Sequence, residues 1–225
     1  MRKALFLSVF ALAGLVSFNA AAADELGEPG QIALSGERIF GLNFFSHKLE
    51  LDGNEQTTSG TSIGLIFNDA ATPYTVPRVA LDYMVADGVS IGGSLGYMSQ
   101  SSETETKTSA GSSTQDNGSV SSFVIAPRVG YVIPVADGAD FWVRGGITYY
   151  SRTVSPDQGD DSKDSGLGLG LEGMFVLSPI PGFGFSIGPT VDFGLSGTQD
   201  PGGGAPELDS KYTNFGLNAG LVGWF

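Results

Sequence analysis

The chain has 225 residues, 34 glycines, no cysteine and a formal net charge of -13. Glycine is roughly twice as frequent as usual, but it shows no G-X-Y period and hydrophobic residues reach 41%, which excludes collagen-like and disordered chains. The missing cysteine excludes disulfide frameworks, thiolate metal sites and cysteine nucleophiles. The acidic excess, with only 11 scattered Lys and Arg, argues against nucleic acid as a partner. The length fits one folded domain, or two at most.

The N-terminus has the three parts of a secretory signal peptide. A positively charged start precedes an apolar stretch at 4–18, and Ala21 and Ala23 occupy the A-x-A positions of a cleavage site. The stretch is short for a bilayer span, so an N-terminal membrane anchor is the less favoured alternative. We predict a signal peptide at 1–23, a periplasmic N-terminal segment at 24–36 and one folded domain at 37–225.

After the signal, the hydrophobic pattern has period 2, which indicates β-strands. In residues 183–195 the odd positions are apolar and the even positions are Gly, Ser, Thr or Asp. The alternation recurs in several further segments: 75–85, 89–97, 123–135, 141–149, 167–177 and 215–221. No apolar run of 18 residues follows the signal, which argues against a helical membrane protein.

The connectors and the polar face together indicate the fold class. Tight turns are expected at 86–88, 135–139 and 178–182, whereas 102–119, 155–164 and 198–210 are long and polar, a rhythm typical of membrane barrels. The second strand face is mostly small, so it fits a narrow lumen better than a water-facing surface. We predict an all-β, transmembrane, antiparallel up-and-down β-barrel with its apolar face toward lipid.

The number of strands follows from where the chain starts and ends. An exported N-terminus and a last strand that returns to the periplasm require an even number. Seven strands are readily placed after residue 74, and we place the first at 37–51, with 52–73 as an outer loop that has room for a strand-like piece. Placing 57–67 in the barrel instead is the alternative, and pairing of 30–36 would allow ten strands. Eight strands is our prediction.

The face assignment places six charged residues in the lumen. Three are arginines and three are carboxylates, and charges in a narrow lumen are costly unless they are paired. The predicted lumen charge network comprises Arg78, Asp82, Arg128, Arg144, Glu172 and Asp192. We expect these groups to pair across strands and plug the barrel, because eight strands leave little interior space. A gated narrow pore or a small polar ligand site is the alternative.

The remaining chemical signals favour no catalytic or metal site. His47 is the only histidine, and Ser46 beside it points to the opposite strand face, so the two form no ready nucleophile and base. The acidic segment 157–164 matches no defined calcium loop. We expect no enzyme activity, cofactor or metal. Aromatic girdles at the membrane interfaces are expected from a set of six residues: Tyr83, Tyr97, Tyr131, Tyr149, Trp142 and Trp224.

These features, with the ending Leu221-Val222-Gly223-Trp224-Phe225, resemble small bacterial outer-membrane β-barrel proteins. The stretches 36–41, 72–83 and 90–97 are similar to the outer-membrane β-barrel domain common in myxobacteria and their relatives. The resemblance implies a location in the bacterial outer membrane and recognition of the last strand by the outer-membrane assembly machinery. The residues that match this assembly signal are Phe215, Leu217, Leu221 and Phe225.

The sequence thus predicts a monomeric outer-membrane barrel with a structural or surface-interaction role, surrounded by outer-membrane lipid and lipopolysaccharide. A narrow pore or transporter for small polar solutes is the alternative function.

Overall fold

The computed structural model describes residues 25–65, 72–108 and 111–225, and the predicted signal peptide at 1–23 lies outside them. Nine strands form one antiparallel sheet: β1 (Ile32–Leu51), β2 (Asn54–Leu65), β3 (Arg78–Ala86), β4 (Val89–Thr108), β5 (Gly111–Ala136), β6 (Ala139–Ser155), β7 (Ser162–Ile180), β8 (Phe183–Asp200) and β9 (Leu208–Trp224). A short 3-10 turn, η2 (Pro73–Thr75), precedes β3. No helix in the described part of the chain is long and apolar enough to cross a membrane.

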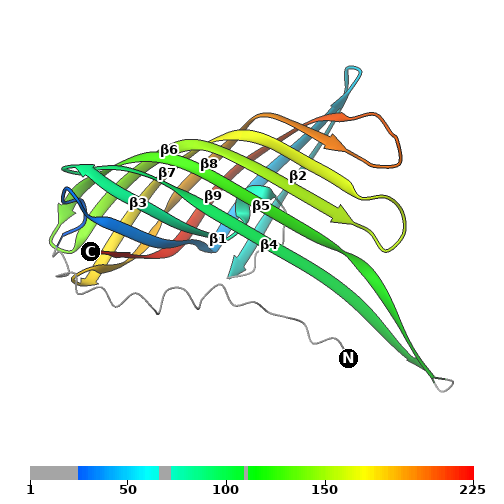
Figure 1. Ribbon diagram of the computed structural model, residues 1–225, viewed down its shortest axis with the longest axis horizontal. Coiled ribbons are helices and arrows are strands. Elements are labelled where there is room, and N and C mark those ends of the chain that lie inside the picture. Colours follow the sequence, from blue (N-terminus) through cyan, green and yellow to red (C-terminus); the bar gives the residue numbers. More distant parts are fainter. Residues whose placement is uncertain (1–24, 66–71, 109–110) are drawn as a thin grey trace.

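Eight of the strands, β1 and β3 to β9, close into a tilted barrel (Figure 1). The ring is closed by β1, which pairs with β9 on one side and with β3 on the other. The backbone of Phe225 continues this closure by pairing with Ile32. The predicted eight-stranded up-and-down barrel is therefore confirmed.

The apolar side of each strand faces outward. On β3, Val79 is 53% exposed and Leu81 50% exposed, whereas Ala80 and Asp82, which alternate with them, are buried. The same alternation follows the other barrel strands, so the ring carries an outer band of Val, Leu, Ile and Phe around an interior that holds the buried charged residues. A closed ring of paired strands satisfies the backbone hydrogen bonds that lipid cannot.

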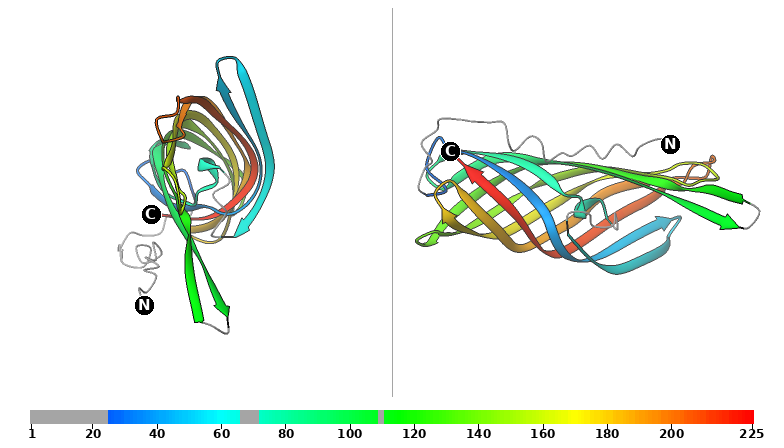
Figure 2. Two further views of the ribbon diagram at one scale, coloured as in Figure 1. Left: turned by 90° about the vertical axis from the view of Figure 1, so that its right-hand side faces the viewer. Right: turned by 90° about the horizontal axis from the view of Figure 1, so that it is seen from below.

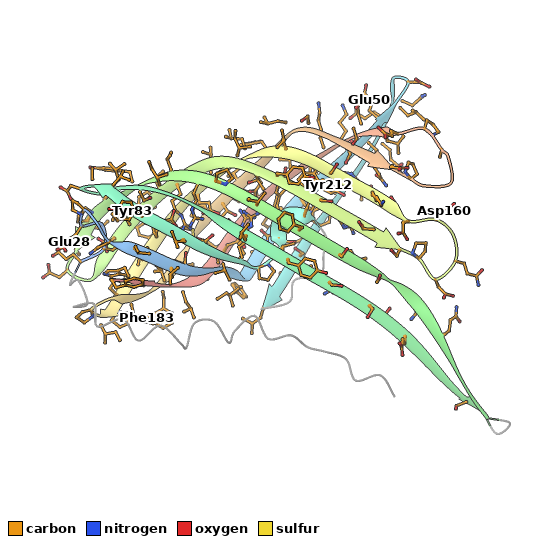
Figure 3. The ribbon with its side chains drawn as sticks, in the orientation of Figure 1. Glu28, Glu50, Tyr83, Asp160, Phe183 and Tyr212 are labelled. Atoms are coloured by element: carbon orange, nitrogen blue, oxygen red, sulfur yellow. The ribbon has the colours of Figure 1, made fainter. Side chains whose placement is uncertain are left out.

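One end of the barrel has short turns and the other has long hairpins. Gly88, Gly138 and Gly182 take positive φ angles in tight turns at the first end, where only glycine is unstrained. Figure 3 shows Glu28, Tyr83 and Phe183 at this end, and Glu50 and Asp160 at the other. Short turns are periplasmic in outer-membrane barrels, so the long hairpins lie outside the cell.

The extracellular connectors are mostly strand rather than loop. Segment 102–119, expected to be a polar loop, is a hairpin in which Thr108 pairs with Gly111, and it extends furthest from the barrel in Figure 1. Ladder hydrogen bonds are made by the backbone, so Ser- and Thr-rich segments can pair without an apolar face. The connectors at 156–161 and 201–207 are correspondingly shorter than predicted.

The first barrel strand begins at Ile32, five residues before the predicted start at 37. The predicted boundary between a segment at 24–36 and a domain at 37–225 therefore falls inside β1. The strand-like piece expected in the outer loop is β2, which forms a hairpin with the upper half of β1. Figure 2 shows this hairpin outside the ring and η2 inside it.

A bulge in β1 explains why the early start was missed. Between Gly36 and Phe40, β1 has two more residues than β9 opposite it, and Arg38 takes a φ of 55°. This bulge turns both Glu37 and Arg38 into the lumen, which breaks the period-2 pattern on which the prediction depended. Because the bulge adds an even number of residues, odd-numbered residues point inward on both sides of it.

Candidate functional site: the barrel lumen

The lumen is filled by three layers of side chains, which we name the base layer, the charge layer and the aromatic layer, from the periplasmic end outward. The base layer is apolar: Leu26, Ala33, Met84, Val132, Trp142, Val176, Val222 and Trp224. Leu26 enters from the N-terminal segment, which Gln31 folds by accepting hydrogen bonds from the backbone of Gly27 and Glu28. The chain before β1 therefore covers the periplasmic mouth.

Arg128 is the centre of one half of the charge layer. Its guanidinium donates to Glu37 through Nη1 and Nη2, both at 2.8 Å, and to Asp82 through Nε at 3.1 Å and Nη2 at 2.5 Å. Arg144 donates a further bond to Glu37 at 2.5 Å. Such forked, charge-assisted bonds are the geometry in which a buried arginine and a carboxylate offset their loss of hydration.

Arg38 organises the other half. It donates to Asp192 through Nη1 and Nη2 at 2.9 and 3.0 Å, and to Glu172 at 3.2 Å. It also donates to the carbonyl of Tyr74 in the η2 segment, as does Arg78 at 3.2 Å. Arg144 joins the halves, because its Nη2 lies 2.8 Å from Glu172.

The charge layer contains all six residues predicted for the lumen and two more, Glu37 and Arg38. Four arginines then face four carboxylates, and every side chain in the ion pairs of this layer is at most 9% exposed. Sequence reasoning missed Glu37 and Arg38 because they are adjacent in the chain, and adjacent residues of a regular strand point to opposite faces. A charged pair directly after Gly36 was the available signal for a bulge.

Glycines give the charged side chains their space. A Cβ on Gly92 would lie 2.5 Å from Oδ1 of Asp82, and one on Gly130 would lie 2.9 Å from Cγ of Arg144. The high glycine content of the lumen face is therefore a packing requirement. A cavity of about 20 Å³ lies among the charges, which is room for roughly one water molecule.

The aromatic layer lies above the charges and packs against η2: Tyr74, Val76, Met98, Val124, Tyr150 and Tyr212. The ring of Tyr150 makes edge contacts with both Tyr74 and Tyr212, at centroid distances of 5.5 and 5.7 Å. The Tyr212 hydroxyl donates to Asp164 at 2.6 Å. This layer was not predicted, because the chain enters the lumen at η2 through a turn that the strand pattern does not show.

His47 belongs to this layer, stacked on Tyr212 with centroids 3.9 Å apart. Its Nε2 lies 3.0 Å from Oγ of Ser210, and that hydroxyl donates to Asp164 at 3.0 Å. The single hydroxyl proton of Ser210 is thus directed at a carboxylate, so in this arrangement Nε2 of His47 is the donor. Ser46 does not join the cluster. Within the described residues, no group of three or more His, Asp or Glu side chains could hold a metal ion.

The outer surface carries the other predicted residues. Phe215, Leu217 and Leu221 lie on the lipid-facing side of β9, and Tyr83, Tyr97, Tyr131 and Tyr149 are all exposed on the outside. The two tryptophans were assigned wrongly to the girdles, since Trp142 and Trp224 are 1% and 2% exposed in the base layer. On β6 and β9 both tryptophans have the same parity as the other buried residues, so the alternation itself places them inside.

Comparison with known proteins agrees with this architecture. OprG from Pseudomonas aeruginosa is similar over 88% of this chain and 97% of its own, with 12% identity and a TM-score of 0.51, which shows the fold alone. Neisserial surface protein A (86% and 98%, 11% identity, TM-score 0.48) and the outer membrane protease OmpT from Escherichia coli (87% and 97%, 8%, 0.44) are more distant. No curated protein sequence matches the chain.

The family is shown by a direct match. Residues 8–222 match the model described as "Outer membrane protein beta-barrel domain", which covers nearly the whole chain. The predicted location in the bacterial outer membrane is confirmed by this match together with the fold. The chain therefore belongs to the outer membrane protein beta-barrel domain family.

Proposed function

We propose that this protein is a closed structural barrel that presents extracellular hairpins, and that it conducts no solute. The observation that carries the proposal is the charge layer, where four arginines and four carboxylates pack around a cavity of about 20 Å³. A pore needs a continuous hydrated path, and here the base layer and the aromatic layer add two further barriers. The surface-interaction role then belongs to the parts that extend beyond the membrane.

The balance of charge supports a plug over a selective pore. Channels select ions with rings of one charge sign, whereas this layer pairs each sign with its opposite. Opening a path past Arg128 would separate it from both Glu37 and Asp82, leaving buried charges without partners. That cost, about 3–5 kcal/mol for one broken buried pair, favours the closed state.

The extracellular hairpins supply the surface for a partner. The β4–β5 hairpin and the β1–β2 hairpin both extend beyond the barrel wall, and neither is covered by another described strand on its outer side (Figures 1 and 2). Exposed loops on a rigid scaffold are where binding function concentrates. Neither the family nor the fold identifies a partner, so the proposed surface-interaction role rests on the exposure of these hairpins.

The proposal includes the absence of catalysis. Ser210 is fully buried, and its hydroxyl donates to Asp164 rather than to His47. A serine activated by a histidine base would instead donate its proton to the imidazole. Replacing His47 with Ala should therefore leave hydrolysis of lipid ester chains at the background level of the native protein. A hydrolytic rate that the native protein shows and H47A loses would contradict this part of the proposal.

Conductance in planar bilayers tests the closed lumen. The folded protein, identified by heat-modifiable migration on gels, should give no steady single-channel steps. The variant Leu26→Ala is a matched control, because it loosens the periplasmic cover but leaves the charge layer intact, and it should stay silent. Steady steps in the native protein that change in Arg128→Ala would instead support the narrow pore for small polar solutes.

A further inference from the structure

The outer wall has a hollow at the upper edge of its apolar band, between β6, β7, β8 and β9. It has a volume of about 490 Å³, within the range of small-molecule sites. Its lower part is formed by Tyr149, Leu167 and Leu195, which face lipid. Its upper part is polar, with Ser165, Ser196, Thr198, Asp209 and Lys211. The hollow therefore has an apolar end toward the membrane and a charged end toward the outside.

A β-bulge in β8 makes the hollow. Leu167 pairs with Ser196, but the next residue of β7, Gly168, pairs with Gly194, so Leu195 is an extra residue in β8. The bulge places the neighbouring Leu195 and Ser196 on the same outward side. Glycines at 166 and 197 form the floor, where a side chain on either would meet the hydroxyl of Tyr150 from within. Only glycine therefore leaves room for the Tyr150 hydroxyl at these two positions.

Lys211 is the cationic group of the hollow, and no carboxylate of the described residues lies within ion-pair distance of it. It stands directly opposite Lys48 in the β1–β9 ladder, and like charges in that position destabilise a sheet. Lys48 has carboxylate partners, with Glu55 at 2.7 Å and Glu50 at 3.6 Å. The hydrogen bond from Lys48 lowers the pKa of the Glu55 carboxyl. No ion pair joins Lys211 to a carboxylate among residues 25–65, 72–108 and 111–225.

We propose that this hollow binds a phosphorylated glycolipid of the outer leaflet, with a phosphate on Lys211 and an acyl chain against Leu167 and Leu195. The hollow is continuous with the lipid-facing band, so the lipid itself is the molecule that reaches it. Lys211 stands at the polar end of the hollow, next to the lipid-facing band, and no described carboxylate forms an ion pair with it, which fits an anionic head group. The proposal is independent of whether the lumen is closed.

Native mass spectrometry of the folded protein in detergent micelles tests the site, with lipid A carrying two phosphates as the probe. The native protein should retain one lipid A. The same lipid without phosphates should be retained about fivefold less, as expected for the loss of one lysine–phosphate contact. Inorganic phosphate should not displace lipid A, because it lacks the acyl chain.

Lys211→Gln is the decisive variant, and Lys163→Gln is its matched control. Both remove one outward positive charge near the extracellular end, but Lys163 stands opposite Asp200 in the ladder and does not line the hollow. Lys211→Gln should lower lipid A retention about fivefold, and Lys163→Gln by less than twofold. Ser196→Trp, which fills the hollow without changing charge, should also lower retention, and heat-modifiable migration verifies the fold of each variant.

Three results would overturn the proposal. Equal retention of lipid A by Lys211→Gln and Lys163→Gln would show that general charge holds the lipid. Equal retention of phosphorylated and phosphate-free lipid would show that no contact between Lys211 and a phosphate holds the lipid. Displacement by inorganic phosphate would mean that the site takes a free anion rather than a lipid.

Discussion

Replacing Arg128 with Met should destabilise the barrel more than any other single change of a lumen charge to an apolar residue. Arg128 donates four hydrogen bonds to Glu37 and Asp82. Glu37 would keep the hydrogen bond from Arg144. Asp82 would stay buried in the charge layer without the guanidinium that donates to both of its carboxylate oxygens. Removing one side of such a buried pair costs about 3–5 kcal/mol, or roughly two to four powers of ten in the folding equilibrium.

The assay is unfolding in urea, with the protein in micelles or lipid vesicles and heat-modifiable migration as the readout. Adding Asp82→Asn to Arg128→Met removes the stranded charge, so the double variant should recover on the order of 0.5–3 kcal/mol. Lys163→Met is the control, because it removes the same charge from an exposed position and should change stability by less than about 0.5 kcal/mol. Arg128→Met as stable as this control would refute the charge layer as a stabilising plug.

Three other predictions follow from the base layer and from β9. Leu26→Ala should lower the free energy of unfolding by about 2–5 kcal/mol in the same urea assay, and an unchanged free energy would contradict the packing of Leu26 in the base layer. The fluorescence of Trp142 and Trp224 should resist quenching by aqueous iodide, because both rings are buried, and strong quenching would mean that water enters the base layer. Phe225→Ala should reduce the fraction of protein assembled in the outer membrane after cell fractionation, and unchanged assembly would remove Phe225 from the assembly signal.

The fold could be predicted from the sequence because a membrane barrel imposes one rule on every strand. Outward positions must be apolar and inward positions must fit a narrow lumen, so alternation identifies both the strands and their faces. Arg78 and Arg128 illustrate this, since both precede their turn aspartates by nine residues and both lie in the charge layer. The sequence pattern therefore predicted the positions of six lumen charges without any contact information.

What the sequence could not show are the departures from that rule. The bulge at Glu37 and Arg38, the entry of η2 into the lumen and the extra residue Leu195 in β8 each break the alternation locally. These irregular sites depend on contacts between distant strands, such as Arg38 with Asp192 across 154 residues of sequence. They also form the plug and the outer hollow, which are the features that the two proposals use.

The closed lumen can be tested most directly by thiol labelling, because the chain has no cysteine of its own. Ser94 lines the small cavity in the charge layer and is buried, whereas Thr57 is exposed on the β1–β2 hairpin. In vesicles, a water-soluble methanethiosulfonate reagent added to both sides should label Thr57→Cys quickly and leave Ser94→Cys unlabelled. Labelling of Ser94→Cys at a rate close to that of Thr57→Cys would show an open aqueous path and contradict the plug.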